Sequence, residues 1–389
     1  MSDAQIVKAP CPMAAPDLTG LRIWVMAKGY APDEGGMQTY ARGVAEAYAR
    51  AGAAVTVFTQ TSVGPRRERI GAVMLVDVGA GKSPLVPFRF LSAMRRERKL
   101  TGAPDYTHAT TWRTSVPPML MGLSYVTSFH GREFMYGEGT TLAVMRRVAR
   151  RARGFLAVSH YSAGRLAARL GPGFPEPQVA WNGLSDEPDP DAPPPAKYSA
   201  AHRGIPLIFS LCRLEARKNI AGAVRACGVA RDAGHLFRYV IGGRGPELDA
   251  IIRLVRELRL EDCIEVAGFV ESKRVEQLYR EADIFLHPQI EVDDGRDFEG
   301  FGIAIADAMV TGTAVIAGIE GGARELIEDG IDGFSVDGRD PDAVSRALDR
   351  LLREPALRDS IGKAARARAL SLFTWDRHIA LVASHNFVI

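Results

Sequence analysis

The sequence predicts an α/β protein made of two doubly wound domains, each built on a parallel sheet. Short apolar runs alternate with glycine-containing loops and amphipathic stretches, which is the pattern of a parallel α/β sheet. A stretch rich in proline and acidic residues, 186–195, interrupts this alternation near the middle. Proline neither continues a helix nor donates a hydrogen bond in a central strand, so the stretch is predicted to be a linker. A chain of 389 residues is long enough for two cores.

Five short apolar runs predict the strands of the first domain. They lie at residues 21–26, 55–58, 73–76, 125–129 and 154–158. A helical stretch at residues 39–51 separates the first two runs. Runs of this length, bounded by glycine and polar residues, are typical of buried strands.

The same alternation resumes after the linker and predicts a second sheet. Its expected strands lie at residues 205–210, 239–243, 264–267, 282–288 and 312–317. Ligands of doubly wound domains bind at the carboxyl ends of the strands, so the loops after these runs are candidates for a binding site. We expect the two domains to face each other across a cleft that holds the site.

We expect five segments along the chain. They are a lead-in at residues 1–20, a first domain at 21–185, a linker at 186–200, a second domain at 201–372 and a terminal helix at 373–389. The lead-in is rich in alanine, proline and small polar residues, so we expect it to be disordered.

Composition excludes several classes of protein. The formal net charge of +3 is too small for a general nucleic-acid binder. No run of about eighteen apolar residues is present, so we expect no membrane span and a cytoplasmic protein. The cysteines have neither metal-binding nor redox spacing, which fits a reducing compartment; they are Cys11, Cys212, Cys227 and Cys263.

The most informative segment carries two carboxylates, Glu299 and Asp307, on either side of a glycine-containing turn. One buried strand ends before it and another begins after it, so the segment is predicted to be a loop that feeds a helix. Gly302 lets the backbone approach a ligand, and the free N–H groups of the helix start suit an anion. One carboxylate can bind sugar hydroxyls and the other a ribose, with a diphosphate between them. Such residues at a helix start can equally be simple caps.

This segment, residues 297–309, resembles the Glu-x7-Glu signature of glycosyltransferase family 4, whose members are retaining glycosyltransferases of the GT-B fold. The resemblance implies that Glu299 contacts the hydroxyls of the donor sugar. It implies that Asp307, one methylene shorter than the family's second glutamate, contacts the nucleotide ribose, and that Phe301, Gly302 and Ile303 bind the donor. It also implies the GT-B architecture of two Rossmann-like domains, with the last helix crossing back onto the first.

Basic residues follow the first strand of the second domain. Arg213 and Lys218 match the family's Arg-x4-Lys pair, which implies a clamp for the leaving diphosphate. Solvated surface charge is the alternative for both. Arg217 has no match in the family, and we expect it on the surface.

Two further stretches of the second domain resemble donor-binding loops. Gly243 lies in a strand-end loop similar to the family's second glycine loop near the nucleotide. Val270 ends a stretch that lies beside the base in the family. A glycine cluster by itself most often marks a tight turn, so this interpretation depends on the resemblance.

In the first domain, Gly35 and Gly36 can bring backbone amides close to a phosphate or an acceptor. The family has a glycine pair here, followed by an aromatic residue or a histidine, and Tyr40 fits that pattern. His130 precedes a glycine at a strand end and resembles the family's histidine that touches the donor sugar and its phosphate. A flexible turn and a structural histidine are the alternatives. His160 is expected to begin a helix.

The resemblance covers nearly the whole chain and implies a function. The expected reaction moves a hexose from a UDP- or GDP-sugar to a glycan or lipid-linked acceptor with retained configuration, in bacterial polysaccharide, lipopolysaccharide or glycolipid synthesis. The donor is a substrate, so no cofactor is expected. No Asp-x-Asp lies at a predicted strand end where it would hold Mg²⁺, so we expect no metal. A nucleotide-sugar epimerase and a non-catalytic nucleotide-sugar-binding subunit are the alternatives.

One arginine-rich stretch suggests a further partner. Its basic residues alternate with apolar ones at helical spacing; they are Arg146, Arg147, Arg150, Arg151 and Arg153. A basic amphipathic helix can rest on an anionic membrane, so peripheral contact with the inner membrane face is one expectation. A solvated helix face packed on its own domain is the other.

Overall fold

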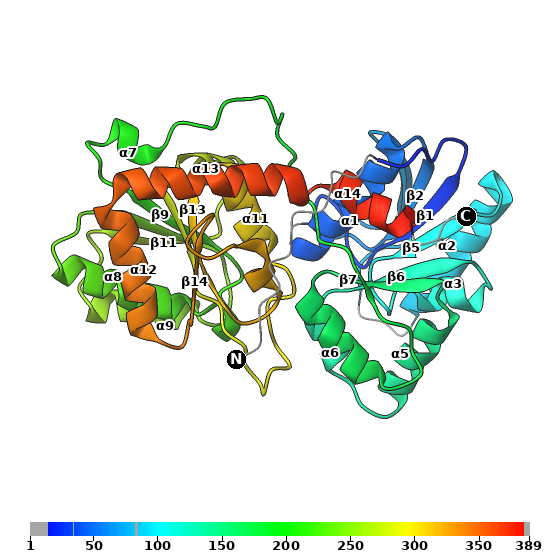
Figure 1. Ribbon diagram of the computed structural model, residues 1–389. Helices are drawn as coiled ribbons and strands as arrows, with labels where there is room; N and C mark the ends of the chain where they lie inside the picture. Colours follow the sequence, from blue (N-terminus) through cyan, green and yellow to red (C-terminus); the bar gives the residue numbers. More distant parts are fainter. Residues whose placement is uncertain (1–14, 34, 82–84, 385–389) are drawn as a thin grey trace.

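The computed structural model describes residues 15–33, 35–81 and 85–384. The chain forms two α/β units, each with a central sheet flanked by helices (Figure 1). The first sheet has eight strands and the second has six. The predicted fold class is therefore confirmed. Residues 1–14 of the expected lead-in lie outside the described part of the chain.

The first sheet runs in the order β3-β4-β2-β1-β5-β6-β7-β8 and is parallel except for the β3–β4 edge pair. Its strands are β1 (Arg22–Met26), β2 (Ala54–Thr59), β3 (Arg66–Ile70), β4 (Val73–Asp77), β5 (Tyr106–Ala109), β6 (Tyr125–Phe129), β7 (Gly154–Ala157) and β8 (Gln178–Val179). The five expected strands are present. The apolar pattern does not predict β3, β5 and β8, because β3 is charged and mostly exposed, β5 is half polar and β8 has two residues.

Helices connect these strands. They are α1 (Gly36–Arg50), α2 (Val86–Thr101), α3 (Val116–Leu120), α4 (Arg132–Met135), α5 (Thr140–Arg151) and α6 (His160–Leu170). His160 begins α6, as expected from the sequence.

The second sheet, β11-β10-β9-β12-β13-β14, is parallel throughout. Its strands are β9 (Leu207–Leu211), β10 (Arg238–Gly242), β11 (Ile264–Gly268), β12 (Ile284–His287), β13 (Ala314–Gly318) and β14 (Phe334–Val336). Phe285 and Leu286 are neighbours in β12 but belong to separate buried clusters. Successive side chains of a strand point to opposite faces, so both faces of this sheet are buried and its strands are almost continuously apolar.

The helices of the second domain complete its core. They are α8 (Ile220–Asp232), α9 (Leu248–Glu257), α10 (Ser272–Glu281), α11 (Ile303–Val310), α12 (Pro341–Arg353) and α13 (Pro355–Leu372), with short 3-10 turns η1 (Ala216–Lys218) and η2 (Gly322–Leu326). Residues 186–195 contain no helix or strand, and α7 (Tyr198–Ala201) follows them.

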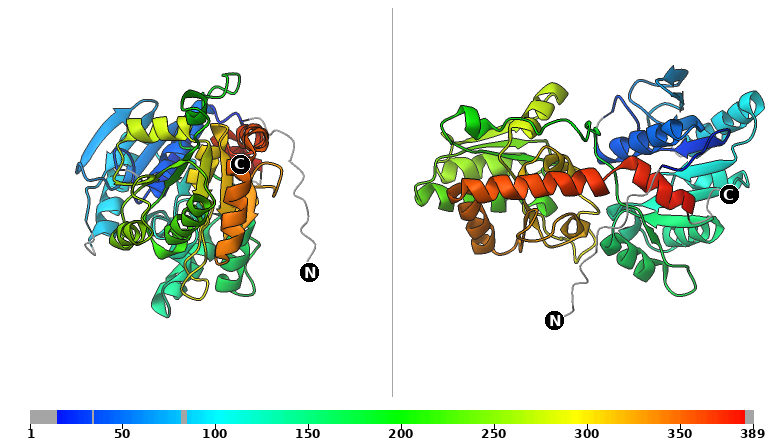
Figure 2. Two further views of the ribbon diagram at one scale, coloured as in Figure 1. Left: turned by 90° about the vertical axis from the view of Figure 1, so that its left-hand side faces the viewer. Right: turned by 45° about the horizontal axis from the view of Figure 1, so that its top comes forward.

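The chain passes between the domains twice. The second passage leads from α13 into α14 (Trp375–Ser384), which packs on α1 of the first domain (Figure 2). The two passages are joined, because the indole N–H of Trp375 donates to the carbonyl of Leu184 at 2.8 Å. A Cβ on Gly43 or Gly183 would lie 2.0 or 2.5 Å from the Trp375 side chain, so both glycines are needed for this packing.

Candidate active site

The carboxyl ends of the second sheet carry most of the predicted donor-binding residues. Arg213 follows β9, Lys218 ends η1, and Gly243 follows β10. Glu299 lies in the loop between β12 and α11. Parallel strands end at one edge of their sheet, so the fold gathers loops that are distant in sequence.

Glu299 lies among positive charges. Its carboxylate pairs with the Lys218 ammonium and accepts a hydrogen bond of 3.0 Å from the Arg217 guanidinium. The His287 Nε2 lies 3.8 Å from the same oxygen. Burial by itself raises the pKa of Glu299, but Lys218 and Arg217 outweigh burial and hold the pKa well below its usual value. Glu299 is therefore an ionised carboxylate in a fixed position.

The prediction that Arg217 lies on the surface is wrong. Only 16% of its side chain is exposed, and its guanidinium contacts Glu215 at 3.1 Å, Asp297 at 3.2 Å and Glu299 at 3.0 Å. These carboxylates come from two loops that are far apart in the sequence. Their convergence on one arginine follows from the strand order and has no signal in local spacing.

Arg213 has the opposite environment. Its side chain is 75% exposed, and its guanidinium lies 3.1 Å from Glu215. Lys218 is buried and is already paired with Glu299. Arg213 is therefore an exposed cation, whereas Lys218 is part of a buried ion pair.

His287, the last residue of β12, is a site residue that the sequence reasoning missed. Its side chain is 1% exposed, and its ring stacks on Phe285 with 5.9 Å between centroids. Burial and, to a smaller extent, the nearby Lys218 lower the pKa of His287 to about 4. A neutral ring therefore flanks Glu299. The only available signal was a polar residue at a strand end.

Gly243 permits the close approach of two loops. A Cβ at this position would lie 1.8 Å from the carbonyl oxygen of Cys212, next to Arg213. The N–H of Gly243 donates to the carbonyl of Gly268 at 2.6 Å. The glycine thus holds the loop after β10 against the loop that carries Arg213. Val270 is buried in the loop after β11.

The helix α11 begins directly after the glycine turn of the predicted signature. Gly302 has a φ of 96°, a left-handed conformation that favours glycine, and Ile303 is the first helical residue. Phe301 is buried, and its ring packs edge-on against Phe373 with 5.6 Å between centroids. Phe301 can therefore offer a ligand its backbone but not its side chain.

Asp307 lies in α11 and contacts the segment that joins the domains. Its carboxylate accepts hydrogen bonds of 2.8 Å from the N–H of Ser185 and 2.7 Å from its hydroxyl. Burial raises the pKa of Asp307 to about 6, against the opposing effect of these hydrogen bonds. The ribose contact of Asp307 stays a prediction, and its observed partner is Ser185.

His130 follows β6 and lies where the two domains touch. A Cβ on Gly300 would lie 1.8 Å from the carbonyl oxygen of His130. Nε2 of His130 donates to the carbonyl of Thr110 at 2.8 Å, and burial lowers the pKa of His130 to about 4. The neutral ring then has Nδ1 as its unprotonated nitrogen. The structure thus places His130 and Glu299, predicted from separate motifs, in adjoining loops.

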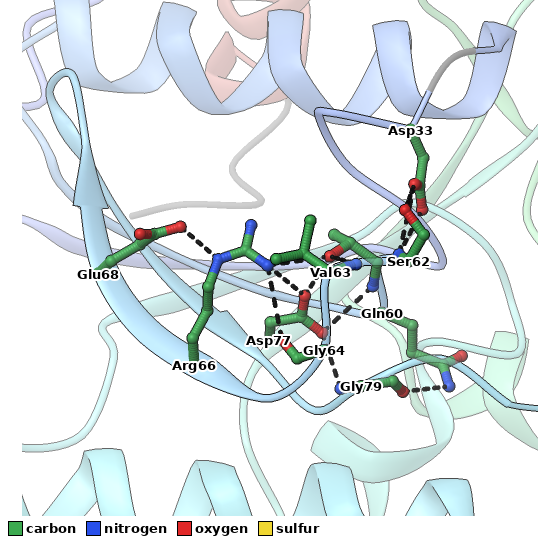
Figure 3. A network of polar contacts seen from close by, with 10 residues as sticks. Asp33, Gln60, Ser62, Val63, Gly64, Arg66, Glu68, Asp77 and Gly79 are labelled. Atoms are coloured by element: carbon green, nitrogen blue, oxygen red, sulfur yellow. Dashed lines mark hydrogen bonds and ion pairs between the residues drawn. The ribbon is translucent and has the colours of Figure 1, made fainter.

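Gly35 and Gly36 stand at the start of α1, and Asp33 before them contacts the loop that follows β2 (Figure 3). Asp33 accepts a hydrogen bond of 3.0 Å from the N–H of Ser62. Asp77 accepts one of 2.7 Å from the N–H of Gly79 and pairs with Arg66 at 3.1 Å. Among the described residues, none crowds a Cβ built on Gly36, whereas a Cβ on Gly35 would lie 2.8 Å from the Gln38 side chain.

Tyr40 matches the family's aromatic position in sequence but does not face a ligand. Its side chain is fully buried, and its hydroxyl forms a hydrogen bond of 2.7 Å with Ser128. Tyr40 therefore lies in the interior of the first domain, where its ring packs against that of His130.

Residues 15–33, 35–81 and 85–384 contain no group of three or more His, Cys, Asp or Glu side chains placed to hold a metal ion. In that same part of the chain, no helix combines the length and apolar character that spanning a bilayer requires.

Two Rossmann-like domains with converging polar loops define the GT-B class of glycosyltransferases. Known families match both halves of the chain: Glycosyltransferase Family 4 over residues 34–187 and Glycosyl transferases group 1 over residues 199–368. The chain therefore belongs to glycosyltransferase family 4, whose members have the GT-B fold.

Two relatives illustrate the family. The GDP-mannose-dependent alpha-(1-6)-phosphatidylinositol monomannoside mannosyltransferase of Mycolicibacterium smegmatis is 29% identical over 302 residues, covering 74% of this chain and 78% of the relative. The amylovoran biosynthesis glycosyltransferase AmsK of Erwinia amylovora is 34% identical over 174 residues, covering 44% of this chain and 42% of the relative.

Among solved structures, sucrose-phosphate synthase from Thermosynechococcus elongatus superposes with a TM-score of 0.75 at 19% identity. The superposition covers 93% of this chain and 96% of the synthase. At this identity the likeness concerns the fold alone.

Proposed function

We propose that this glycosyltransferase moves a hexose from a UDP- or GDP-sugar to an acceptor hydroxyl with retained configuration, and that it needs neither a metal nor a cofactor. The observation that carries the proposal is the position of Glu299, ionised and fixed by Lys218 and Arg217, in a loop adjoining His130. A fixed carboxylate can bind sugar hydroxyls in one orientation. Arg213 and the start of α11 can then oppose the charge of the leaving diphosphate.

The same geometry disfavours Glu299 as a covalent nucleophile, because its carboxylate is held in ion pairs. We therefore favour attack by the acceptor on the face from which the diphosphate leaves, with a phosphate oxygen taking the acceptor's proton. In this mechanism the protein contributes positioning and electrostatic stabilisation.

The relatives support two classes of acceptor. One relative is named for a phosphatidylinositol mannoside and the other for the synthesis of a polysaccharide, amylovoran. We propose a glycan or lipid-linked acceptor for this chain, in polysaccharide or glycolipid synthesis. The first relative's GDP-mannose makes this the first donor to test.

Contact with an anionic membrane is part of the proposal and rests on α5. Its apolar residues Met145 and Val148 are buried in the first domain, so they cannot enter a bilayer. The exposed residues Arg147, Arg150 and Arg151 keep their charge at the surface. Val144 of the same helix is 40% exposed, so binding through α5 would rest chiefly on the arginines and would be reversible.

Nucleotide release tests the function directly. Purified protein is incubated with UDP- and GDP-sugars, with and without glycan and glycolipid acceptors, and the free nucleotide and the anomeric configuration of the product are measured. We expect acceptor-dependent release and a retained anomer. An isomerised donor without acceptor would instead indicate an epimerase. Donor binding, seen as a rise in Tm, without turnover across the panel would indicate a binding subunit.

A further inference from the structure

A buried hydrogen-bonded chain lies behind His130 and joins the first domain to the terminal helix. Its side chains come from α1, β5, β6 and α14, and they are Tyr48, His108, Ser128, Tyr40 and His378. All are at most 1% exposed. The chain ends at a backbone carbonyl, where His378 Nδ1 lies 2.9 Å from the oxygen of Trp181.

The carbonyl of Trp181 sets the direction of all the hydrogen bonds in this series. The carbonyl of Trp181 can only accept, so His378 carries its proton on Nδ1. Burial lowers the pKa of His378 to about 4, so the ring is neutral and Nε2 accepts. The Tyr40 hydroxyl lies 3.0 Å from this Nε2 and therefore donates to it.

The remaining links follow in turn. The Tyr40 oxygen, its own proton used, accepts from the Ser128 hydroxyl at 2.7 Å. Ser128 must then accept from His108 Nε2 at 2.8 Å, and His108 Nδ1 accepts from the Tyr48 hydroxyl at 2.9 Å. The reverse order would leave the Ser128–Tyr40 contact without a proton. His108 Nε2 also lies 3.2 Å from the Tyr40 oxygen, which can accept from it too. One arrangement thus satisfies every link, and it requires both histidines to be neutral with opposite tautomers.

This series of hydrogen bonds fixes the ring of Tyr40, which packs against His130. The rings of Tyr40 and His130 meet edge to face, with 4.5 Å between centroids and an interplanar angle of 85°. Trp375 packs edge-on against the same tyrosine at 5.4 Å. The hydroxyl of Tyr40 holds the ring against rotation and sliding, since it is bound to both Ser128 and His378.

We propose that Tyr40 and His378 are positioning residues that hold the imidazole of His130 in its reactive orientation, so that the terminal helix α14 is part of the catalytic machinery. The proposal rests on the proposed function and on the resemblance, which implies that His130 touches the donor sugar and its phosphate. Nδ1 of His130 is its unprotonated nitrogen, and its direction is set by the Thr110 carbonyl on one side and the Tyr40 ring on the other. A misplacement of a catalytic group by about 1 Å can lower the rate by about 10²-fold.

The tautomers are tested first, without any assay of activity. Two-dimensional ¹H–¹⁵N spectra of the histidine side chains of the full chain, assigned with His→Gln variants, report the protonated nitrogen. We expect the Nδ1–H form for His378, the Nε2–H form for His108 and the Nε2–H form for His130 at neutral pH. An Nε2–H or a charged His378 would overturn the proposal.

Kinetics then test the positioning role. His378→Phe removes the acceptor for Tyr40, and Tyr40→Phe removes its hydroxyl but keeps the ring. We expect each to lower kcat by about tenfold or more while the KM for the donor stays within about threefold, because the donor contacts assigned to Glu299, Arg213 and α11 are unchanged. His378→Gln, which can still accept from Tyr40, should recover most of the loss. His202→Gln, at an exposed histidine of the second domain, is the control.

The outcomes separate this inference from the proposed function. An active wild-type enzyme whose Tyr40→Phe and His378→Phe variants keep full kcat would overturn the positioning role alone. A wild type with no transferase activity, but with the expected tautomers, would overturn the proposed function while the hydrogen-bonded chain stands. Shifted ¹⁵N resonances of His130 in a folded His378→Phe variant would support the link directly.

Discussion

Arg217 and Glu299 form an ion pair of 3.0 Å in the interior of the second domain, and the same guanidinium also binds Glu215 and Asp297. One cation therefore neutralises carboxylates from the loops after β9 and β12. The pair fixes the side chain to which we assign recognition of the donor sugar.

Replacing Arg217 by alanine should destabilise the second domain. The change leaves three carboxylates with less positive charge in a buried site, and breaking such a pair costs about 3 kcal/mol or more. We expect a loss of this size in the free energy of unfolding, measured by urea denaturation. Arg225→Ala, at an exposed arginine of α8, is the matched control and should change little. Equal stability of the two variants would show that Arg217 has no structural role.

Replacing Arg213 by alanine should lower turnover by about 10²-fold at saturating donor, because an exposed guanidinium beside the strand end opposes charge on the leaving diphosphate. Stability should be unchanged, since the side chain is exposed. Lys218→Ala should lower turnover as well, but with a loss of stability, because it leaves Glu299 short of a partner. If both variants turn over at the wild-type rate, the assignment of the diphosphate clamp is wrong.

Replacing Glu299 by glutamine should remove recognition of the sugar and leave binding of the bare nucleotide diphosphate nearly intact. Glu299 precedes the glycine turn in a loop that adjoins His130, whereas the nucleotide is assigned to α11 and the loop after β10. Calorimetry with the nucleotide and with the full donor measures both affinities. A similar loss for the two ligands would contradict the assignment.

Replacing Asp307 by asparagine should weaken nucleotide binding about tenfold, because a neutral amide accepts weaker hydrogen bonds from a ribose than a carboxylate does. The pKa of Asp307 is about 6, so the wild-type carboxyl is ionised above this pH and protonated below it. Wild-type affinity should therefore fall as the pH drops below about 6, and the variant's affinity should not follow that change.

Ser185→Ala is the control for Asp307, because it removes the hydroxyl that binds the carboxylate and leaves the carboxylate in place. If Asp307 binds the ribose, this variant keeps its nucleotide affinity. Equal losses from the two substitutions would assign Asp307 to the junction between the domains instead.

Replacing Arg147, Arg150 and Arg151 of α5 by glutamine should abolish any binding to anionic vesicles. Each basic residue near such a surface contributes on the order of 1 kcal/mol, and salt screens it. Co-sedimentation at low and high salt, with and without anionic lipid, measures the effect, and we expect lipid-dependent binding only at low salt. Binding that is absent at low salt, or unchanged in the variant, would leave α5 as a solvated helix face.

Many of the secondary-structure elements can be predicted from local sequence patterns. The apolar runs predicted ten strands that the structure contains, and the glycine turn between Glu299 and Asp307 predicted the start of α11. The secondary structure of a segment depends largely on its own residues and on the spacing of its apolar side chains. Such elements can therefore be predicted without knowledge of the fold. Strands that are short, polar or at a sheet edge, such as β3 and β8, lack this signal.

The sequence by itself determined the two α/β domains, the linker and the motifs that identify the family. Only the tertiary structure decided what surrounds each charged or polar side chain. Arg217 is buried because three carboxylates converge on it, His287 becomes a neighbour of Glu299, and Tyr40 turns inward to bind a histidine of the terminal helix. Burial and electrostatic partners depend on residues that are distant in sequence, and no local pattern encodes them.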